Sequence, residues 1–392
     1  MPVTRGDAIA LARALVRLDS RNPSLVPGAP GEQAAARMLA EVLEAWGMWV
    51  EVIEAAPGRP NVIARSGYGT GRSMLLNGHL DVVGVDGMVH APFDGEERGS
   101  RLYGRGAADM KGGIAAMCAA AARAVEAGAT GDVIIAAVAD EEFQSLGTRA
   151  LIDSGLRADA AIVTEPTRLA IAPAHRGFVW IDVEVRGRAA HGSRYDLGVD
   201  AIRHAALVLA ELDRLERDEL VHRTHLLLGH ASLHASLIEG GSGMSTYPDR
   251  CLVKLERRTL PGERVDDAVR EVEDACARVR ERIGTLDADV RLVFSQSPSD
   301  VAVDAPIVRA LGAALASTGE DVRVEGLSAW TDAALLNDAG IPAICFGPGD
   351  IALAHSAEEW VDMDEIERAT AALTHLVAGW CGSQRGGHGW PT

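Results

Sequence analysis

The sequence predicts an α/β protein whose sheet has helices on both faces, with a smaller domain inserted into it. Helical and strand patterns alternate through the first 175 residues, as they do in such a layered fold. The order then changes to strand-helix-strand-strand-helix-strand over about residues 178–296, and the alternating pattern returns after it. A chain of 392 residues is also long for a single core, which favours more than one domain.

The first part of the chain is expected to supply most of the main sheet. Helices are predicted where apolar side chains recur every three or four positions, and strands where short apolar runs occur. The predicted helices are 6–18, 31–46, 112–126 and 148–153, and the predicted strands are 49–53, 61–64, 74–76, 133–139 and 160–163.

The inserted segment has the order of a ferredoxin-like unit, βαββαβ. Its predicted strands are 178–185, 233–238, 251–256 and 289–294, and its predicted helices are 199–215 and 265–283. A helix at 307–317, a strand at 342–346 and a helix at 363–380 follow. We therefore expect a discontinuous main domain at 1–177 and 297–382, an inserted domain at 178–296, and a flexible glycine-rich tail at 383–392.

Composition excludes several kinds of partner. The net charge of -18 disfavours binding to nucleic acid and to anionic membranes. No run of about 18 apolar residues suggests a membrane span, and no apolar secretory signal is recognised near Met1. The five cysteines are scattered without a CxxC pair, which indicates reduced thiols. A cytoplasmic protein is expected.

Histidine and carboxylate side chains follow the ends of several predicted strands. In open α/β sheets the carboxyl ends of strands converge on one crevice, so these segments are expected to form a single site. The segments are NGHLD (77–81), GRGAADMKGG (104–113), DEE (140–142), TEP (164–166), and GPG (347–349) with His355 six residues further on.

These residue types suit a divalent cation. Zinc takes imidazole nitrogen and carboxylate oxygen, and the same ligands accept Co²⁺ or Mn²⁺. Two ions about 3.5–4 Å apart need one shared carboxylate plus separate ligands. Apolar strands that run directly into acidic residues are otherwise unusual, because a buried unpaired carboxylate is costly.

Taken together, the motifs GHLDVV, GRGAADMKGG, ADEE, TEP and the late AHS resemble those of a dinuclear-zinc family. That family includes acetylornithine deacetylase, succinyl-diaminopimelate desuccinylase, aminoacylase and glutamate carboxypeptidase. The resemblance covers about residues 5–382 in the right order. It implies a zinc-exopeptidase-like mixed sheet that forms a metal-binding catalytic domain, with the inserted domain serving as a lid and dimerisation domain.

The resemblance also implies roles for individual residues. His79 and Glu165 would bind one metal, and Glu142 and His355 the other, with Asp109 bridging the two. Asp81 would hydrogen-bond the His79 ring and fix its tautomer. Glu141 would be the general base that activates the attacking water and returns the proton to the leaving amine.

Further residues of the inserted segment and a late turn resemble parts of the family's substrate site. His191 would reach the active site of a partner subunit and stabilise the oxyanion. Arg258 would clamp a substrate carboxylate, and Gly347, Pro348 and Gly349 would form a substrate-cradling turn. Relatives often have Asn where this chain has Ser245, a departure that concerns the expected substrate contacts and not the metal ligands.

Each of these residues has an ordinary structural alternative. Asp109 could cap the following helix, and Glu141 and Glu142 could be solvated strand-end charges. Arg258 could pair with Glu256 or Glu263, and Arg257 is its immediate rival. The group His222, His225, His230 and His234 lacks a known ligand pattern and is expected to lie on the surface.

The expected function is two-metal hydrolysis of an amide bond in a small N-acyl amino acid that carries a free carboxylate. A metallo-carboxypeptidase or dipeptidase of the same family is the first alternative. A non-catalytic binding protein on this scaffold is an alternative of another class, and the presence of Glu141 beside a full ligand set argues against it. The resemblance implies a homodimer through the lid.

Overall fold

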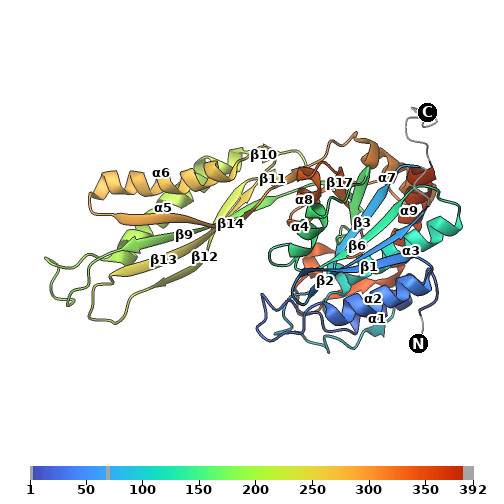
Figure 1. Ribbon diagram of the computed structural model, residues 1–392. Coiled ribbons are helices and arrows are strands. Elements are labelled where there is room, and N and C mark those ends of the chain that lie inside the picture. The colour runs from blue at the N-terminus through green and yellow to red at the C-terminus, as the bar shows by residue number, and fades with distance from the viewer. Residues whose placement is uncertain (1–2, 68–70, 383–392) are drawn as a thin grey trace. The chain divides into compact units, whose positions relative to one another are not determined.

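The computed structural model describes residues 3–67 and 71–382, which divide into two compact units (Figure 1). The second unit comprises Ala174–Asp300 and Ser328–Trp330, and the first unit comprises the rest. The segment predicted as an inserted domain, 178–296, thus lies within the second unit. The predicted tail, 383–392, lies outside the described residues.

The first unit is built on a mixed sheet, as expected. Strand β3 pairs in parallel with β6 and β7, and β17 pairs in parallel with β7. Strands β1, β2 and β8 join this centre in antiparallel pairs. The order is β1 (Trp49–Ala56), β2 (Arg59–Ser66), β6 (Val133–Val138), β3 (Met74–His79), β7 (Ala160–Val163), β17 (Ala343–Cys345) and β8 (Ile171–His175), and β16 (Val324–Leu327) pairs with β8.

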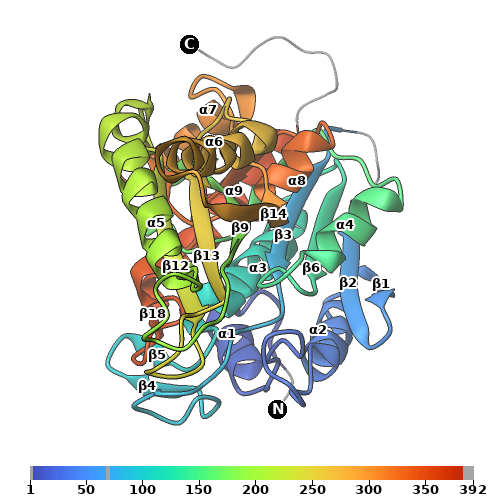
Figure 2. The same cartoon turned by 90° about the vertical axis from the view of Figure 1, so that its left-hand side faces the viewer.

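Helices cover both faces of this sheet (Figure 2). Alternate residues of the central strands face opposite sides: Met74 and Leu76 join the larger core, whereas Leu75 between them does not. That core is shared with α1 (Ala8–Val16), α2 (Gln33–Ala45), α3 (Gly112–Glu126), α7 (Pro306–Ser317) and α9 (Met363–Gly382). On the other side, α4 (Leu146–Asp153) and α8 (Ala333–Asp338) contact each other and the sheet. Strands covered on both faces read as continuous apolar runs, which explains why VIIAAV forms all of β6.

Helix α3 approaches the sheet closely because it begins with two glycines. A Cβ on Gly113 would lie 2.0 Å from the main-chain oxygen of Thr164, so only glycine fits there. A Cβ on Gly347 would lie 2.5 Å from the same oxygen. These two glycines therefore fix the main chain that leads into Glu165.

A small antiparallel sheet lies outside the main one and was not predicted. It has the order β18 (Trp360–Asp362), β5 (Arg101–Tyr103) and β4 (Glu96–Arg98). Strands this short leave no alternation for a sequence pattern to reveal.

The second unit has the predicted βαββαβ order. Its antiparallel sheet runs β12 (Ser232–Gly240), β13 (Arg250–Thr259), β9 (Gly177–Arg186) and β14 (Asp287–Gln296), with helices α5 (Ala201–Asp218) and α6 (Val265–Ile283) packed against it. Val179, Ile181, Val183 and Val185 of β9 are fully buried in its core. Two short pairs complete it: β10 (Thr224–His225) with β11 (Gly229–His230), and β15 (Ser299–Asp300) with the last two residues of β8.

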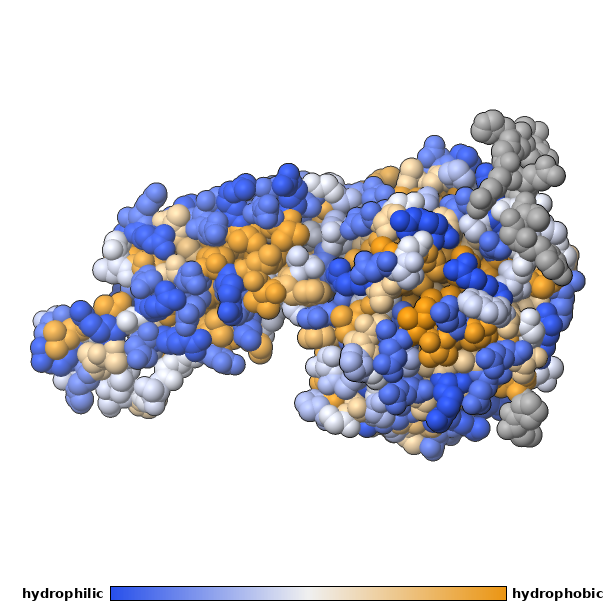
Figure 3. Space-filling view, viewed as in Figure 1, coloured by the Kyte–Doolittle hydropathy of each residue, from blue (hydrophilic) through white to orange (hydrophobic). Residues whose placement is uncertain are grey.

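The outer surface of the second unit is partly apolar, as Figure 3 shows. Exposed aliphatic side chains from its strands are Leu237 and Ile238 of β12 and Leu292 and Val293 of β14. Within residues 3–67 and 71–382, no helix has the length and apolar character needed to cross a membrane.

Candidate metal centre

The predicted site residues of the first unit come from neighbouring strand ends. His79 is the last residue of β3, and Glu141 and Glu142 follow β6 in the turn before α4. Glu165 follows β7, and His355 follows β17 and the short helix η3 (Ile351–Leu353). Because β3, β6, β7 and β17 are parallel, their carboxyl ends meet at one edge of the sheet.

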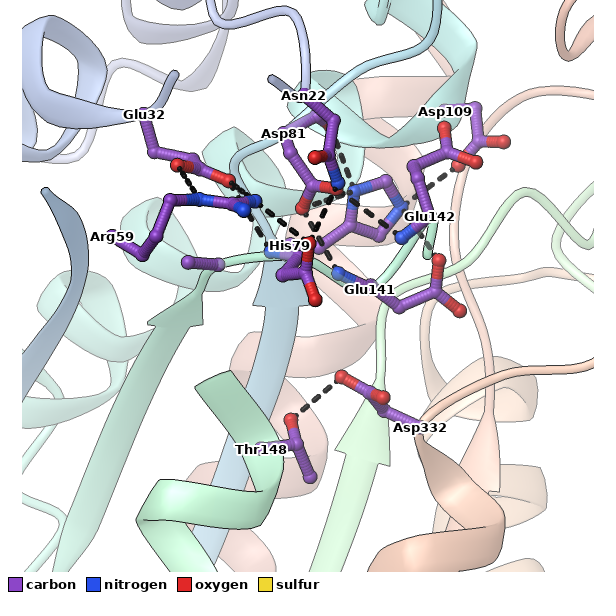
Figure 4. A network of polar contacts seen from close by, with 12 residues as sticks. Asn22, Glu32, Arg59, His79, Asp81, Asp109, Glu141, Glu142, Thr148 and Asp332 are labelled. Atoms are coloured by element: carbon purple, nitrogen blue, oxygen red, sulfur yellow. Dashed lines mark hydrogen bonds and ion pairs between the residues drawn. The ribbon is translucent and has the colours of Figure 1, made fainter. Parts of the chain in front are cut away.

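Asp109 lies between the two histidines. Its Oδ1 is 3.0 Å from His79 Nε2, and its Oδ2 is 3.5 Å from His355 Nε2 (Figure 4 shows its contact with His79). Asp109 belongs to a distorted turn, η1 (Ala107–Lys111), in which its own main chain is not helical. It is therefore not a simple helix cap, and each of its oxygens faces a different imidazole.

The other carboxylates complete two overlapping groups. Glu142 Oε2 is 3.0 Å from His355 Nε2, and Glu165 Oε1 is 4.0 Å from His79 Nε2. In each group, one ligand atom per residue can be chosen so that all lie within 4.8 Å of one another. The groups are His79, Asp109 and Glu165, and Asp109, Glu142 and His355.

The carboxylates of this cluster disfavour one another's ionisation. Burial raises the pKa of Glu165 well above its usual value, and the nearby charge of Asp109 adds to the effect. Burial also raises the pKa of Glu142, again with a contribution from Asp109. Carboxylates that repel one another in a buried site are stabilised by bound cations. The donor set of imidazole and carboxylate fits two divalent ions of the zinc type.

The pKa values of the two histidines are raised as well. Burial disfavours a charge on His79, but its hydrogen bond to Asp109 and the charges of Glu141 and Asp81 outweigh that cost and raise its pKa. Hydrogen bonds to Asp109 and Glu142 raise the pKa of His355 to about 10. Although burial alone would raise the pKa of Asp109, its hydrogen bonds to His355 and His79 hold it below the usual value. Asp109 is therefore anionic at neutral pH.

Asp81 holds the His79 ring through its main chain. His79 Nδ1 donates to the Asp81 carbonyl oxygen at 2.9 Å, whereas the nearer carboxylate oxygen is 3.7 Å away. Because a carbonyl only accepts, Nδ1 carries the proton and Nε2 faces the carboxylates. The Asp81 carboxylate instead accepts the main-chain N–H groups of Glu141 and Glu142, at 3.1 and 3.2 Å.

Glu141 lies beside this ligand set. Its Oε2 is 3.9 Å from His79 Nε2. Burial raises its pKa well above the usual value; the charge of His79 opposes this, and the charges of Glu165 and Asp332 add to it. A carboxylate next to the two groups, outside either of them, is in the position that a general base needs.

Several residues of the site were missed by the sequence analysis. The buried Glu359 accepts the main-chain N–H groups of Ala108 and Asp109, both at 3.1 Å, and pairs with Arg105 at 2.6 Å. Asp332 accepts a hydrogen bond from Thr148 at 2.6 Å, and burial raises its pKa to about 6 (Figure 4). Asn22, Glu32, Arg59 and Asp140 form a further buried network next to Asp81. Asp140 belongs to the DEE motif but was given no role there; each of the others lies far along the chain from its partners, and no short motif marks it.

The comparisons with known proteins identify the family of the chain. Residues 75–379 match peptidase family M20/M25/M40. The chain belongs to this family. Acetylornithine deacetylase of Myxococcus xanthus is 33% identical over 341 residues, which are 84% of this chain and 87% of that relative. A deformylase of Bacillus subtilis (strain 168), named for N-formyl-4-amino-5-aminomethyl-2-methylpyrimidine, is 28% identical. That alignment covers 97% of this chain and 96% of the deformylase.

Solved structures of the M20 family have the same fold. A tripeptidase of Staphylococcus aureus subsp. aureus Mu50 superposes with a TM-score of 0.81 at 19% identity, over 98% of this chain and 100% of that one. The resemblance drawn from the motifs and the predicted fold class are thereby confirmed. This M20-family chain is a hydrolase of carbon–nitrogen bonds, so the non-catalytic alternative is set aside.

The two glycines of the predicted substrate turn are tied into the structure of this M20-family protein. Gly347 donates its N–H to Thr167 Oγ1 at 3.1 Å, and Gly349 donates its N–H to Glu365 at 2.8 Å. Gly349 has a left-handed backbone conformation, with φ of 91°, which glycine adopts without strain. Both glycines are buried, and both of their N–H groups are engaged within the protein.

The remaining predicted residues belong to the second unit. His191 is exposed, and its Nδ1 lies 2.8 Å from Ser193 Oγ. Arg258 pairs with Glu256 and stacks over the Phe178 ring, 5.5 Å from its centre. Its neighbour Arg257 is 1% exposed and is held by Glu263 and Glu271, so Arg257 is the structural member of the pair. His222, His225, His230 and His234 are absent from both candidate metal groups found among the described residues.

Proposed function

We propose that this M20-family hydrolase cleaves the amide bond of a small N-acyl amino acid at a centre of two divalent cations. One observation carries the proposal: the two oxygens of Asp109 face two different histidines, each of which has its own additional carboxylate. His79, Asp109 and Glu165 would hold one cation, and Asp109, Glu142 and His355 the other.

The ligand chemistry favours Zn²⁺, with Co²⁺ and Mn²⁺ as alternatives. When bound, such cations polarise the scissile carbonyl and make water a stronger nucleophile at neutral pH. The protein's own contribution begins with orientation. The Asp81 carbonyl fixes the tautomer of His79, so that the Nε2 lone pair is available for a cation.

Glu141 is proposed as the general base. It would take a proton from the attacking water and return it to the leaving amine, in keeping with its position beside both groups. Its N–H donates to the Asp81 carboxylate, which ties the catalytic turn to the residue that also orients His79. Asp81 is thus a positioning residue for both.

The substrate is proposed to carry a free carboxylate. Arg258 would bind it with its guanidinium fork, and the turn of Gly347, Pro348 and Gly349 would cradle the rest of the substrate. An acyl substrate is preferred over a peptide because the acetylornithine deacetylase of Myxococcus xanthus is similar over most of its length. A dipeptide or carboxypeptidase substrate is the second candidate, supported by the tripeptidase that shares the fold.

The proposal extends to assembly and location. His191 would act on a substrate held by a second copy of the chain, within a homodimer formed through the second unit, which would act as a lid. The exposed aliphatic residues of β12 and β14 favour such an interface. The five cysteines are all free and buried, which suits the reducing cytoplasm.

A substrate panel tests this proposal. Purified protein with measured metal content would be given N-acetyl, N-formyl and N-succinyl amino acids alongside dipeptides of the same side chains. The account expects the highest kcat/KM for an N-acyl amino acid and a sharp loss when its carboxylate is converted to an amide. A higher kcat/KM for dipeptides would select the second candidate, and no hydrolysis in either set would reject both.

A further inference from the structure

A buried polar network lies behind the turn that carries Glu141 and Glu142 (Figure 4). It contains the guanidinium of Arg59, from the start of β2, which is 7% exposed. Arg59 Nε donates to Glu32 Oε2 at 2.8 Å, and Arg59 Nη2 lies 2.9 Å from Asp140 Oδ1. The main-chain N–H of Asp140 points to Glu32 at 3.3 Å. Arg59 and Glu32 thus both bond Asp140, the residue immediately before Glu141.

Asn22 links Asp140 to Asp81. Its side-chain amide nitrogen donates to Asp81 Oδ2 at 2.8 Å and to Asp140 Oδ1 at 3.0 Å. Both hydrogens of the amide are therefore used, one on each of two buried carboxylates. The bonded residues are 59 and 118 positions away along the chain.

Asp81 connects Asn22 to the turn that carries Glu141 and Glu142. Its two oxygens accept the N–H groups of Glu141 and Glu142. The turn starts at Asp140, whose φ of 68° is unusual for a residue with a side chain. Asp140 also accepts the main-chain N–H of Gln144 on its side chain at 3.2 Å. The bonds that Asn22 and Arg59 make to Asp140, together with those that the turn makes to Asp81, stabilise this conformation.

We infer that Asn22 and Arg59 are positioning residues for the Glu141–Glu142 turn, acting through Asp81 and Asp140. The inference rests on the proposed function for the roles of Glu141 and Glu142. Neither Asn22 nor Arg59 contacts a candidate ligand side chain, so their effect is on where the turn sits.

The chemistry of the network explains why these residue types are needed. Asp81 and Asp140 are both fully buried, and buried carboxylates need hydrogen-bond donors. Asparagine supplies two N–H groups without charge. Aspartate in its place would offer no donor and would add a further negative charge. Arginine supplies a cation, in a fork that matches Glu32.

The test uses three variants and one control. Asn22→Ser keeps a single donor, Asn22→Asp keeps the shape without a donor, and Arg59→Lys keeps the charge without the fork. Asn337→Ser is the control, because Asn337 also bonds main-chain groups, at Ala333 and Ala343, outside this network. For each variant, the thermal midpoint, the zinc affinity of the apoprotein, and kcat and KM would be measured.

Loss of such indirect support typically costs about 10- to 100-fold in metal affinity or activity. We expect Asn22→Ser and Asn22→Asp to weaken binding of the zinc beside Glu142 and His355 by this factor, because Glu142 moves with the turn. The zinc beside His79 and Glu165 should be retained. kcat per bound metal should fall with KM nearly constant, and Asn22→Asp should be the more affected. Arg59→Lys should show the same effects in weaker form. Asn337→Ser should lower the thermal midpoint and leave zinc affinity and kcat unchanged.

The inference is overturned if folded Asn22 and Arg59 variants bind two zinc ions and turn over as the control does. If both Asn22 variants fail to fold, Arg59→Lys decides by the same comparison. Zinc affinity needs no substrate, so an inactive wild-type protein would reject the proposed function, while the zinc measurements would still judge the positioning role.

Discussion

The Glu359 carboxylate accepts the main-chain N–H of Asp109 at 3.1 Å, and thereby holds the carboxylate that faces both histidines. The same oxygen accepts the N–H of Ala108, and the other oxygen pairs with Arg105. Burial raises the pKa of Glu359 to about 7, with Arg105 opposing the shift. Asp109 is therefore positioned by a buried ion pair and not by the helix that follows it.

Glu359→Gln should weaken both the fold and the metal centre. The amide would leave Arg105 buried without an anion, which we expect to cost about 3 kcal/mol of unfolding free energy. Zinc affinity should fall by about 10- to 100-fold, because Asp109 loses its support. Urea unfolding of the apoprotein and zinc titration measure the two effects. Glu358→Gln at the exposed neighbouring position is the control and should change neither quantity.

Glu141→Gln should separate catalysis from metal binding. The substitution preserves shape but removes the base, so kcat should fall by about 10²- to 10⁴-fold. Zinc content should stay at the wild-type value, because Glu141 belongs to neither ligand group. Steady-state kinetics and metal analysis of the same sample provide the check. An unchanged kcat would remove Glu141 from the mechanism.

Gly113→Ala should destabilise the protein although alanine is the better helix former. In an open helix this change would stabilise by up to about 1 kcal/mol. Here the new Cβ would lie 2.0 Å from the Thr164 oxygen, so α3 or the segment leading into Glu165 must move. Gly312→Ala in α7 is the matched control, since its Cβ would be 3.5 Å from the nearest side chain, an ordinary contact. Thermal melts should move in opposite directions, and parallel shifts would contradict this account of the close approach.

The sequence predicted the elements whose burial pattern is local. VIIAAV is apolar throughout and forms β6, and the amphipathic segment Val265–Ile283 forms α6 with the predicted bounds. It did not predict β8, where Pro173 interrupts the strand pattern, or the three-residue strands β4, β5 and β18. Such elements exist because of the strands beside them, and nothing in their own residues requires them.

The site was predicted to the extent that short motifs mark it. His79, Asp109, Glu142, Glu165 and His355 sit at strand ends or next to a glycine-rich turn, and the structure brings them together. Asn22, Arg59 and Glu359 have no such marker, because their roles depend on partners far along the chain. The Asp81 motif was recognised, but the sequence could not show that its carbonyl, and not its carboxylate, bonds the ring.

His175 should make stability depend on pH. It is 2% exposed, its Nδ1 donates to the Arg176 carbonyl at 3.0 Å, and burial lowers its pKa to about 4. In the unfolded chain its pKa is about 6.5. Between these values the unfolded state binds the extra proton, so unfolding free energy falls as pH drops from about 6.5 to 4, by up to about 3 kcal/mol.

His175→Asn tests this dependence, because the amide keeps a donor near Nδ1 and does not titrate. The wild-type advantage over the variant in urea unfolding of the apoprotein should be largest above pH 7 and shrink toward pH 4. Curves that stay parallel across that range would show that His175 does not titrate as inferred.

The central claim is that Asp109 is shared between two cations, one beside His79 and Glu165 and the other beside Glu142 and His355. Diffraction from crystals grown with zinc, recorded on either side of the zinc absorption edge, tests it most directly. The account predicts two anomalous peaks, one on each side of the Asp109 carboxylate. Peaks elsewhere, or a single peak that leaves Asp109 bound to one cation only, would contradict it.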